Sequence, residues 1–466
     1  MANYNRKTRT SSTSPTRSQR SVSVVAGDAM EYRIARLFAW QGYFVRRGRE
    51  IFTAAGLDRA TDLDVLALRF RELFSKESII VESKTGGEGP LDRVFWLSGV
   101  KTFVEADRAF LFRKPTKWNI KDFAKRAGVE IIDQAWLEQL ESVHLRDARI
   151  WPGVCDPEFI HPRIGTWNGI LRGSPKFQEL YLTLSTETRF DSPFAGVNFW
   201  VHHLRGLTKN WGTEARDAKE LAAFLIADAV GQLSVFLMRI AQFGADLRPE
   251  DRRGMVEKGL TYGELDPVLA KKVFDHAYRL SKATLREFLT RDVPLDQSLF
   301  AIPRPDHADV MATVVDDIVA HSIQATTFPQ IADLIMAEGF LKGIRNQGLL
   351  RQIFPADGLA TRVALVRRYL LALVSLGALP DQVKQILDAR QGVPAEVAEH
   401  TAEGAALVAQ PELFGSAENQ PHQDRYRKDQ TEQEPAERGG QTGIGESGEG
   451  KSIGSEGGDS KNVSGA

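Results

Sequence analysis

Two carboxylates and a lysine at the ends of apolar segments are the residues of this chain best suited to chemistry. Asp64 lies within the apolar stretch 61–70, and Glu82 and Lys84 close the β-branched run 79–81. Residues two apart on a strand point to the same face, so Glu82 and Lys84 project together and an aspartate on a neighbouring strand can face them. Two carboxylates with a backbone carbonyl suit Mg²⁺, or Mn²⁺ in its place.

A divalent cation held in this way indicates hydrolysis of a phosphodiester. The ion polarises the phosphate and lowers the pKa of a bound water, and a lysine beside it orients or helps deprotonate that water. Glu31, on a predicted helix nearer the N-terminus, could complete a second metal site or hold the water network. Asp62 would point the same way as Asp64 on a regular strand, so it is a rival ligand.

The elements that must position these residues follow an α/β order. Apolar periodicity predicts helices over 28–41, 91–106, 119–127 and 134–140, and strands over 61–70, 78–82, 109–112 and 129–132. Strand-length apolar runs that alternate with amphipathic helices are typical of an α/β unit. Farther along the chain the periodicity becomes almost wholly helical, which predicts helices over 216–243, 266–290, 308–323, 328–340 and 360–376.

Three segments of the first part resemble the restriction-endonuclease-like PD-(D/E)xK nucleases, in particular their Mrr-like branch. These segments are 27–31 (GDAME), 61–67 (TDLDVLA) and 79–84 (IIVESK), and 127–133 followed by a short helix resembles the end of that fold. The resemblance implies a mixed sheet flanked by helices and Mg²⁺-dependent cleavage of DNA. On the matching positions it makes Asp64 and Glu82 the metal ligands, Lys84 the catalytic lysine and Glu31 the supporting helix acid.

Changes in composition divide the chain into five parts. Residues 1–23 form a basic arm without acids and 416–466 a Gly/Ser/Glu-rich tail, and both are expected to be disordered. Residues 24–145 carry the nuclease-like pattern, 146–214 form a connecting region rich in Pro, Gly and Trp, and 215–415 form an α-helical domain. The expected fold class is therefore α/β, a restriction-endonuclease-like mixed sheet followed by a mainly α-helical domain.

Charge gives weaker guidance about partners. The formal net charge of −1 excludes a histone-like or ribosomal polycation. Local basic clusters could still neutralise phosphates on either side of a cleft, and a solvated surface is the alternative that stays open. The predicted nucleic-acid-binding residues are Arg46, Arg47 and Arg49, after the first helix, and Lys117 and Lys121, beside Trp118.

Three further features of the sequence bear on the compartment and on cofactors. The single cysteine, Cys155, and an N-terminus without an apolar core favour a reducing, cytoplasmic location. The apolar stretch 221–238 is interrupted by Asp228 and Gln232, so a buried helix is favoured over a membrane span. Residues 445–452 match the phosphate-loop pattern, but a phosphate loop needs a preceding strand and a following helix, so ATP is not expected.

The sequence thus predicts a metal-dependent endonuclease that hydrolyses DNA in restriction, defence or repair, with no membrane partner. Double-strand cleavage usually needs two active sites, which is compatible with a homodimer. The rival is a catalytically inactive nuclease-fold module that binds nucleic acid or protein. Convergence of Asp64, Glu82 and Lys84 in an open cleft would favour the enzyme, whereas a buried ion pair at Lys84 or an averted Glu82 would favour the module.

Overall fold

The computed structural model describes residues 26–52, 59–83, 89–186, 192–263, 267–288, 302–343 and 347–388. The sheet-bearing and helical parts belong to one compact unit, Met1–Val393. Lys84 lies outside the described residues. So do the predicted arm 1–23, the predicted tail 416–466 and the phosphate-loop-like string within that tail.

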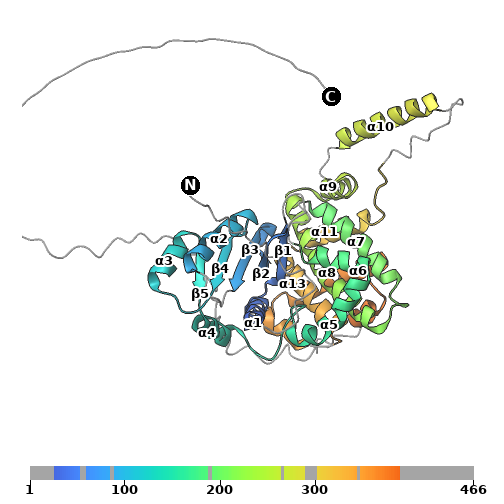
Figure 1. Cartoon of the computed structure of the whole chain (residues 1–466). Helices are drawn as coiled ribbons and strands as arrows, with labels where there is room; N and C mark the ends of the chain where they lie inside the picture. The colour runs from blue at the N-terminus through green and yellow to red at the C-terminus, as the bar shows by residue number, and fades with distance from the viewer. Residues whose placement is uncertain are drawn as a thin grey trace, which may run out of the picture. The chain divides into compact units, whose positions relative to one another are not determined.

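The first part contains a five-stranded mixed sheet, whose strands lie in the order in which they occur in the chain. The strands β1, β2 and β3 pair antiparallel, and β3, β4 and β5 pair parallel. Their bounds are β1 Phe44–Phe52, β2 Arg59–Phe70, β3 Lys76–Ser83, β4 Arg108–Phe112 and β5 Val129–Ile132. The predicted α/β class, with a mixed sheet and flanking helices followed by a helical part, is confirmed (Figure 1).

Four helices accompany the sheet: α1 Ala26–Trp40, α2 Pro90–Phe103, α3 Trp118–Arg126 and α4 Gln134–His144. The short 3₁₀ turn η2, Glu72–Phe74, joins β2 to β3. A parallel pair needs a crossover connection, and α2 and α3 supply the crossovers from β3 to β4 and from β4 to β5. On one face of the sheet Phe38 of α1 packs against Phe110 of β4, with ring centroids 6.4 Å apart.

Strand β1 was missed by the sequence analysis, which treated Arg46, Arg47 and Arg49 as a surface patch. Arginines at three of nine positions hide the apolar residues that mark a strand. The strand nevertheless pairs with β2 along its length, from Phe44 opposite Leu68 to Phe52 opposite Arg59.

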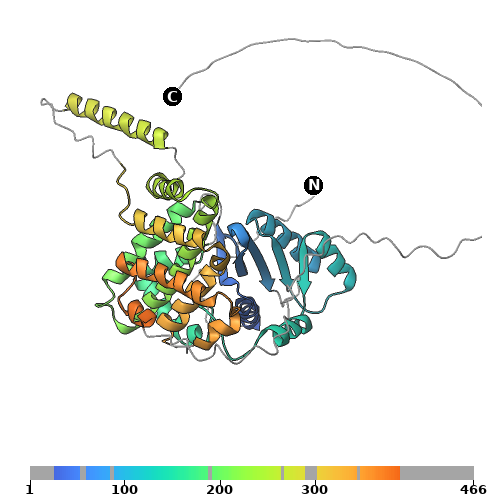
Figure 2. The same ribbon diagram turned by 180° about the vertical axis from the view of Figure 1, so that it is seen from behind.

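The helical part follows the sheet in the chain (Figure 2). It holds most of the hydrophobic core. Its helices are α5 Pro157–Gly173, α6 Pro175–Leu184, α7 Pro193–Lys209, α8 Arg216–Phe243, α9 Pro249–Tyr262, α10 Pro267–Phe288, α11 Ala308–Ala320, α12 Ser322–Ala325, α13 Phe328–Leu334, α14 Gln347–Ile353, α15 Leu359–Ser375 and α16 Gln382–Asp388. A π-helical turn, η4 Ile335–Leu341, continues α13.

The predicted connecting region 146–214 differs from expectation because most of it is helical. Helices α5, α6 and α7 each carry a proline in the first turn, at Pro157, Pro175 and Pro193. Proline lacks only an N–H that has no intrahelical partner at that position, and its fixed φ suits the helix. The prolines therefore begin helices here instead of marking a linker.

Helix α8 lies at the centre of the helical core. Among the described helices it alone is long and apolar enough to cross a membrane, but 83% of its most apolar window is buried inside the protein. The predicted buried helix over 221–238 is thus confirmed. Gly231 on this helix leaves no room for a methyl group, because an added Cβ would lie 2.5 Å from Arg46 Nη2. The sheet and α8 approach closely at this point.

Candidate functional site

The carboxylates of Asp64 and Glu82 come from neighbouring antiparallel strands. The pairing of β2 with β3 has Val65 opposite Val81. Asp64 and Glu82 are the next residues along each strand, so they occupy opposing positions in this register. Side chains in opposing positions point to the same face of a sheet. The sequence-predicted pair is therefore brought together by the register of the two strands.

The two strands begin to separate at this point. The backbone pairing stops at Val65 and Val81, and beyond it the carboxylate of Asp64 accepts the backbone N–H of Ser83, with Oδ2 2.6 Å from N. The Asp64 carboxylate therefore accepts a hydrogen bond that a backbone carbonyl would accept in a regular pair of strands. The hydrogen bond to a charged acceptor fixes the orientation of Asp64.

Both carboxylates are buried. Asp64 is 8% exposed and Glu82 is 2% exposed. Buried carboxylates need cations or several hydrogen-bond donors nearby, because burial disfavours their charge. Arg93, in the first turn of α2, places its Nη1 3.8 Å from Oε1 of Glu82.

Arg93 is a residue that the sequence analysis did not single out. A strand, a short loop and a helix in succession place the first turn of the helix over the end of the strand, and this signal could have identified it. The contact also shows that α2 covers the face of the sheet that bears Glu82.

The donor set fits a magnesium ion better than a transition metal. Mg²⁺ is commonly held by one or two carboxylates, with waters or substrate oxygens in its other positions. Asp64 and Glu82 supply two such carboxylates side by side. Within the described ranges no group of three or more His, Cys, Asp or Glu side chains could enclose a metal.

Asp62, the rival ligand, is held by a neighbouring arginine. Its carboxylate lies 2.9 Å from Arg59 Nη2, and the same guanidinium reaches Glu50 at 3.3 Å. Asp62 stands opposite Glu50 of β1 and is about half exposed. This geometry favours Asp64 over Asp62 as the partner of Glu82.

Glu31 is not brought to the two carboxylates. Its Oε2 accepts a hydrogen bond from Arg47 Nη2 at 2.5 Å. Arg47 stands opposite Val65 in the register, and Val65 points to the face opposite that of its neighbour Asp64. The assignment of Glu31 to this site is therefore corrected: it forms an ion pair on the other face of the sheet.

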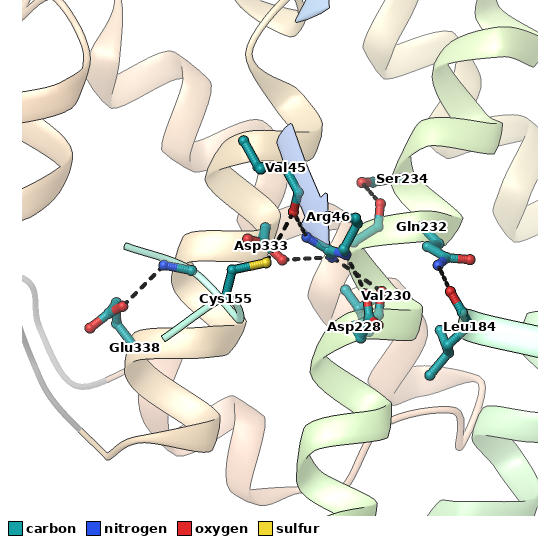
Figure 3. A network of polar contacts seen from close by, with 12 residues as sticks. Val45, Arg46, Cys155, Leu184, Asp228, Val230, Gln232, Ser234, Asp333 and Glu338 are labelled. Atoms are coloured by element: carbon teal, nitrogen blue, oxygen red, sulfur yellow. Dashed lines mark hydrogen bonds and ion pairs between the residues drawn. The ribbon is translucent and has the colours of Figure 1, made fainter. Parts of the chain in front are cut away.

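Arg46 and Arg49 form a buried ionic network, which corrects their assignment to nucleic-acid contacts. Each is 3% exposed. Arg46 Nε donates to Asp228 of α8, and Arg46 Nη2 donates to Asp333 of α13 at 2.8 Å (Figure 3). Arg49 reaches Asp228 at 3.5 Å. Neither guanidinium is exposed on the surface of the protein, where the backbone of a DNA duplex would contact it.

Arg46 and Arg49 both reach Asp228, and Gly48 lies between them on β1. Regular alternation would direct Arg46 and Arg49 to opposite faces of β1. Gly48 has a φ of 58°, a conformation that glycine adopts at little cost, and the register with β2 continues unchanged from Arg47 to Arg49. Burial alone would lower the pKa of Arg46, but Asp228 and Asp333 raise it above its ordinary value. The guanidinium therefore stays charged.

The prediction that Arg47 binds nucleic acid is also corrected, because its guanidinium is engaged within the protein. Besides its ion pair with Glu31, its guanidinium lies 3.4 Å from the ring centroid of Tyr32. Burial would lower the pKa of Arg47, but Tyr32, Glu31 and Cys155 beside it raise the pKa above its ordinary value. Its role in the described structure is to attach α1 to β1.

Lys117 and Lys121 lie at a position compatible with their prediction. Strands β3 and β4 are parallel, with Ser83 opposite Phe112, so their carboxyl ends meet at one edge of the sheet. Lys117, at the start of α3, is exposed just beyond that edge. Lys121 forms an ion pair with Asp133, whose carboxylate lies 3.0 Å from the Nζ of the lysine. Asp64 and Glu82 lie at the same edge.

Comparison with protein-family models, with curated proteins and with solved structures found no match for this chain.

Proposed function

We propose that the protein is a metal-dependent endonuclease that hydrolyses DNA phosphodiester bonds through Asp64, Glu82 and Lys84. The observation that carries this proposal is the opposed pair Asp64 and Glu82 at the point where β2 and β3 separate. Two carboxylates in this arrangement could hold Mg²⁺, which when bound polarises a phosphate and acidifies a water. The family resemblance of this part of the chain agrees with the proposal.

Three residues around the two carboxylates would each have a separate role in the proposed hydrolysis. The Ser83 N–H orients Asp64, so that this carboxylate enters the site in one conformation. Arg93 supplies positive charge beside Glu82 and stabilises the pair before substrate binds. Lys84, two residues after Glu82, would hold the attacking water and offset the charge that develops on the phosphate.

The DNA would contact the carboxyl edge of the parallel strands. Arg113, Lys114 and Lys117 follow β4 at this edge. Trp118, the first residue of α3, is 77% exposed among them. An exposed aromatic ring can stack on an unpaired nucleobase, while the basic side chains around it bind the phosphates of the nucleic-acid backbone.

Trp118→Ala is expected to weaken binding of single-stranded oligonucleotides roughly 5- to 150-fold, because stacking on one base contributes about 1–3 kcal/mol. Lys117→Ala is expected to lower the slope of log K against log salt by about 1. Fluorescence anisotropy at several salt concentrations without divalent metal measures both effects. Phe103→Ala is the matched control, because Phe103 is 61% exposed at the other end of α2. An equal loss of affinity in Trp118→Ala and Phe103→Ala would contradict the proposal that Trp118 lies on the DNA-binding surface.

One observation favours the inactive binding module as a second candidate. Glu82 is almost fully buried, and Arg93 stands where a cation would neutralise it. An arginine in that position can replace a metal as the counter-ion, which preserves the fold without catalysis. Binding of Mn²⁺ distinguishes the two, since the module has no need of a metal at this point.

The proposal is tested by incubating purified full-length protein with supercoiled and linear DNA, with and without Mg²⁺ or Mn²⁺, beside Lys84→Ala. We expect metal-dependent nicking by the wild type and its loss in the variant. Circular dichroism confirms that the variant is folded. Equal cleavage by both proteins would point to contamination or to another site. DNA binding without cleavage and without Mn²⁺ binding would support the inactive module.

A further inference from the structure

A small cavity lies between the sheet and α8, on strands β1 and β2. It has a volume of about 70 Å³ and is partly open to solvent. Four basic residues contribute to its wall, and the described residues of that wall include no acid. These bases are Arg46, Arg49, Lys76 and Arg239. A cavity with this lining is suited to an anion.

The charge of the wall is fixed by burial. Arg46 and Arg49 are each 3% exposed, so their guanidinium groups cannot turn away into solvent. Asp228 contacts both arginines, and Asp333 contacts Arg46 on the side of α13 (Figure 3). These carboxylates hold the arginines in place from outside the cavity wall. A buried cation gains when an anion lies beside it, because water no longer screens the pair.

The geometry of the donors suits a phosphate. Arg46 already donates from Nε to Asp228, from Nη1 to the carbonyl of Val45 and from Nη2 to Asp333. The planar fork that would meet two phosphate oxygens is therefore that of Arg239, with the ammonium of Lys76 on the same wall. Gln232 also lines the cavity, and its amide nitrogen donates to the carbonyl of Leu184 at 2.9 Å, which fixes the orientation of the amide. Arg46 is stacked over Phe44, with its guanidinium carbon 4.0 Å from the ring centroid. The donors are thus positioned before any ligand arrives.

The apolar part of the wall indicates an organic group beside the phosphate. Phe44 and Phe236 face the cavity together with Leu66 and Leu68. Ligand sites commonly combine an apolar lining with a few convergent polar groups. The cavity is too small and too enclosed for the backbone of a duplex, but it accommodates a phosphate with a small substituent at its mouth.

We propose that this cavity binds the phosphate group of a small molecule, such as a phosphomonoester or free inorganic phosphate. The site is separate from the carboxylates Asp64 and Glu82 but is built on the same strands. Leu66, in its wall, lies two residues from Asp64 on the same face of β2, roughly 7 Å along the strand. The proposal does not depend on nuclease activity.

Calorimetric titration of the full-length protein with inorganic phosphate, with adenosine monophosphate and with a short DNA duplex tests the proposal. The titrations use chloride buffer of constant ionic strength without divalent metal. We expect the two small ligands to bind and to raise the midpoint of thermal unfolding. Arg239→Gln and Lys76→Gln are expected to weaken this binding by roughly tenfold or more, since each removes a charged donor. Lys76 is exposed and Arg239 is half-buried, so these variants should fold.

Lys209→Gln is the matched control, because Lys209 is exposed at the end of α7 and does not line the cavity. Its binding should equal that of the wild type. The proposal is overturned if neither small ligand binds, or if Arg239→Gln and Lys76→Gln bind them as the wild type does. It is also overturned if the duplex displaces phosphate through the same two residues, which would make the cavity a contact for nucleic acid.

Discussion

Replacing Arg46 with methionine is expected to lower the free energy of unfolding by about 3–5 kcal/mol, because the change leaves Asp333 buried without this guanidinium and Asp228 with only the more distant Arg49. The total for a domain is commonly about 5–15 kcal/mol, so the loss is a large fraction of stability. Methionine keeps much of the volume of the side chain, which separates the loss of charge from the loss of packing. Urea unfolding followed by circular dichroism measures the effect.

A matched surface substitution controls for the removal of an arginine. Arg149 forms an ion pair with Asp147 at 2.9 Å, but its side chain is 90% exposed. Arg149→Met is therefore expected to leave the free energy of unfolding nearly unchanged. A double variant of Arg46→Met with Asp333→Asn should regain part of the loss, since Asp228 keeps Arg49 as its cation and the carboxylate that depended on Arg46 is no longer charged. Equal stability of Arg46→Met and the wild type would contradict the network.

The sign of the pH dependence provides a second readout for Arg46→Met. Burial raises the pKa of Asp333, and Arg46 opposes this increase. Without Arg46 the pKa of the folded carboxyl rises further above its unfolded value. Protonation then favours the folded state, so the variant should recover stability as the pH falls below that raised pKa and lose it as the pH rises through it. The gap to the wild type should therefore be smaller in acid.

Asp64→Asn and Glu82→Gln are each expected to reduce metal-dependent cleavage of DNA by about a thousandfold or more, since the carboxylates would supply several kcal/mol through the bound cation. Both changes are isosteric. The asparagine oxygen can still accept the Ser83 N–H, so the end of β3 should keep its position. Single-turnover cleavage of supercoiled DNA with Mg²⁺ measures the rate.

Glu77→Gln is the matched control on the same strand. Glu77 is 8% exposed and binds Arg69 and Arg71, so it is a buried carboxylate without a proposed catalytic role. Its removal should reduce stability while leaving the rate unchanged. Arg93→Gln should strengthen Mn²⁺ binding, because a competing cation is removed from Glu82. If Asp64→Asn and Glu82→Gln cleave as fast as Glu77→Gln, the active site lies elsewhere.

The sheet elements were predictable where local periodicity determines them. Strand β5 agrees with the predicted 129–132, and β4 differs from the predicted 109–112 by one residue at its start. Apolar runs bounded by helices identify such strands without knowledge of the tertiary structure. The opposition of Asp64 and Glu82 was also foreseeable, because two successive strands joined by a short turn pair antiparallel.

The remaining parts depended on contacts between distant residues. Strand β1 reads as polar until Asp228 and Asp333 are known to neutralise Arg46, and these partners are 182 and 287 residues away. The position of Glu31 depended on which face of the sheet α1 covers. Prolines in the first turns of α5, α6 and α7 are compatible with both a linker and a helix start, and only tertiary packing decided between them.

The long separation within the ionic network has a consequence for synthesis on the ribosome. The five strands lie in chain order, so the sheet can assemble while later residues are still being translated. Arg46 must then wait for Asp333, which emerges 287 residues later, roughly 15–60 s at about 5–20 residues per second. For the first 182 residues of that interval the outer strand carries Arg46 without either carboxylate, and from then until α13 emerges Asp228 is the one of the two that is present. The nascent sheet is therefore exposed to chaperones and proteases until α13 arrives.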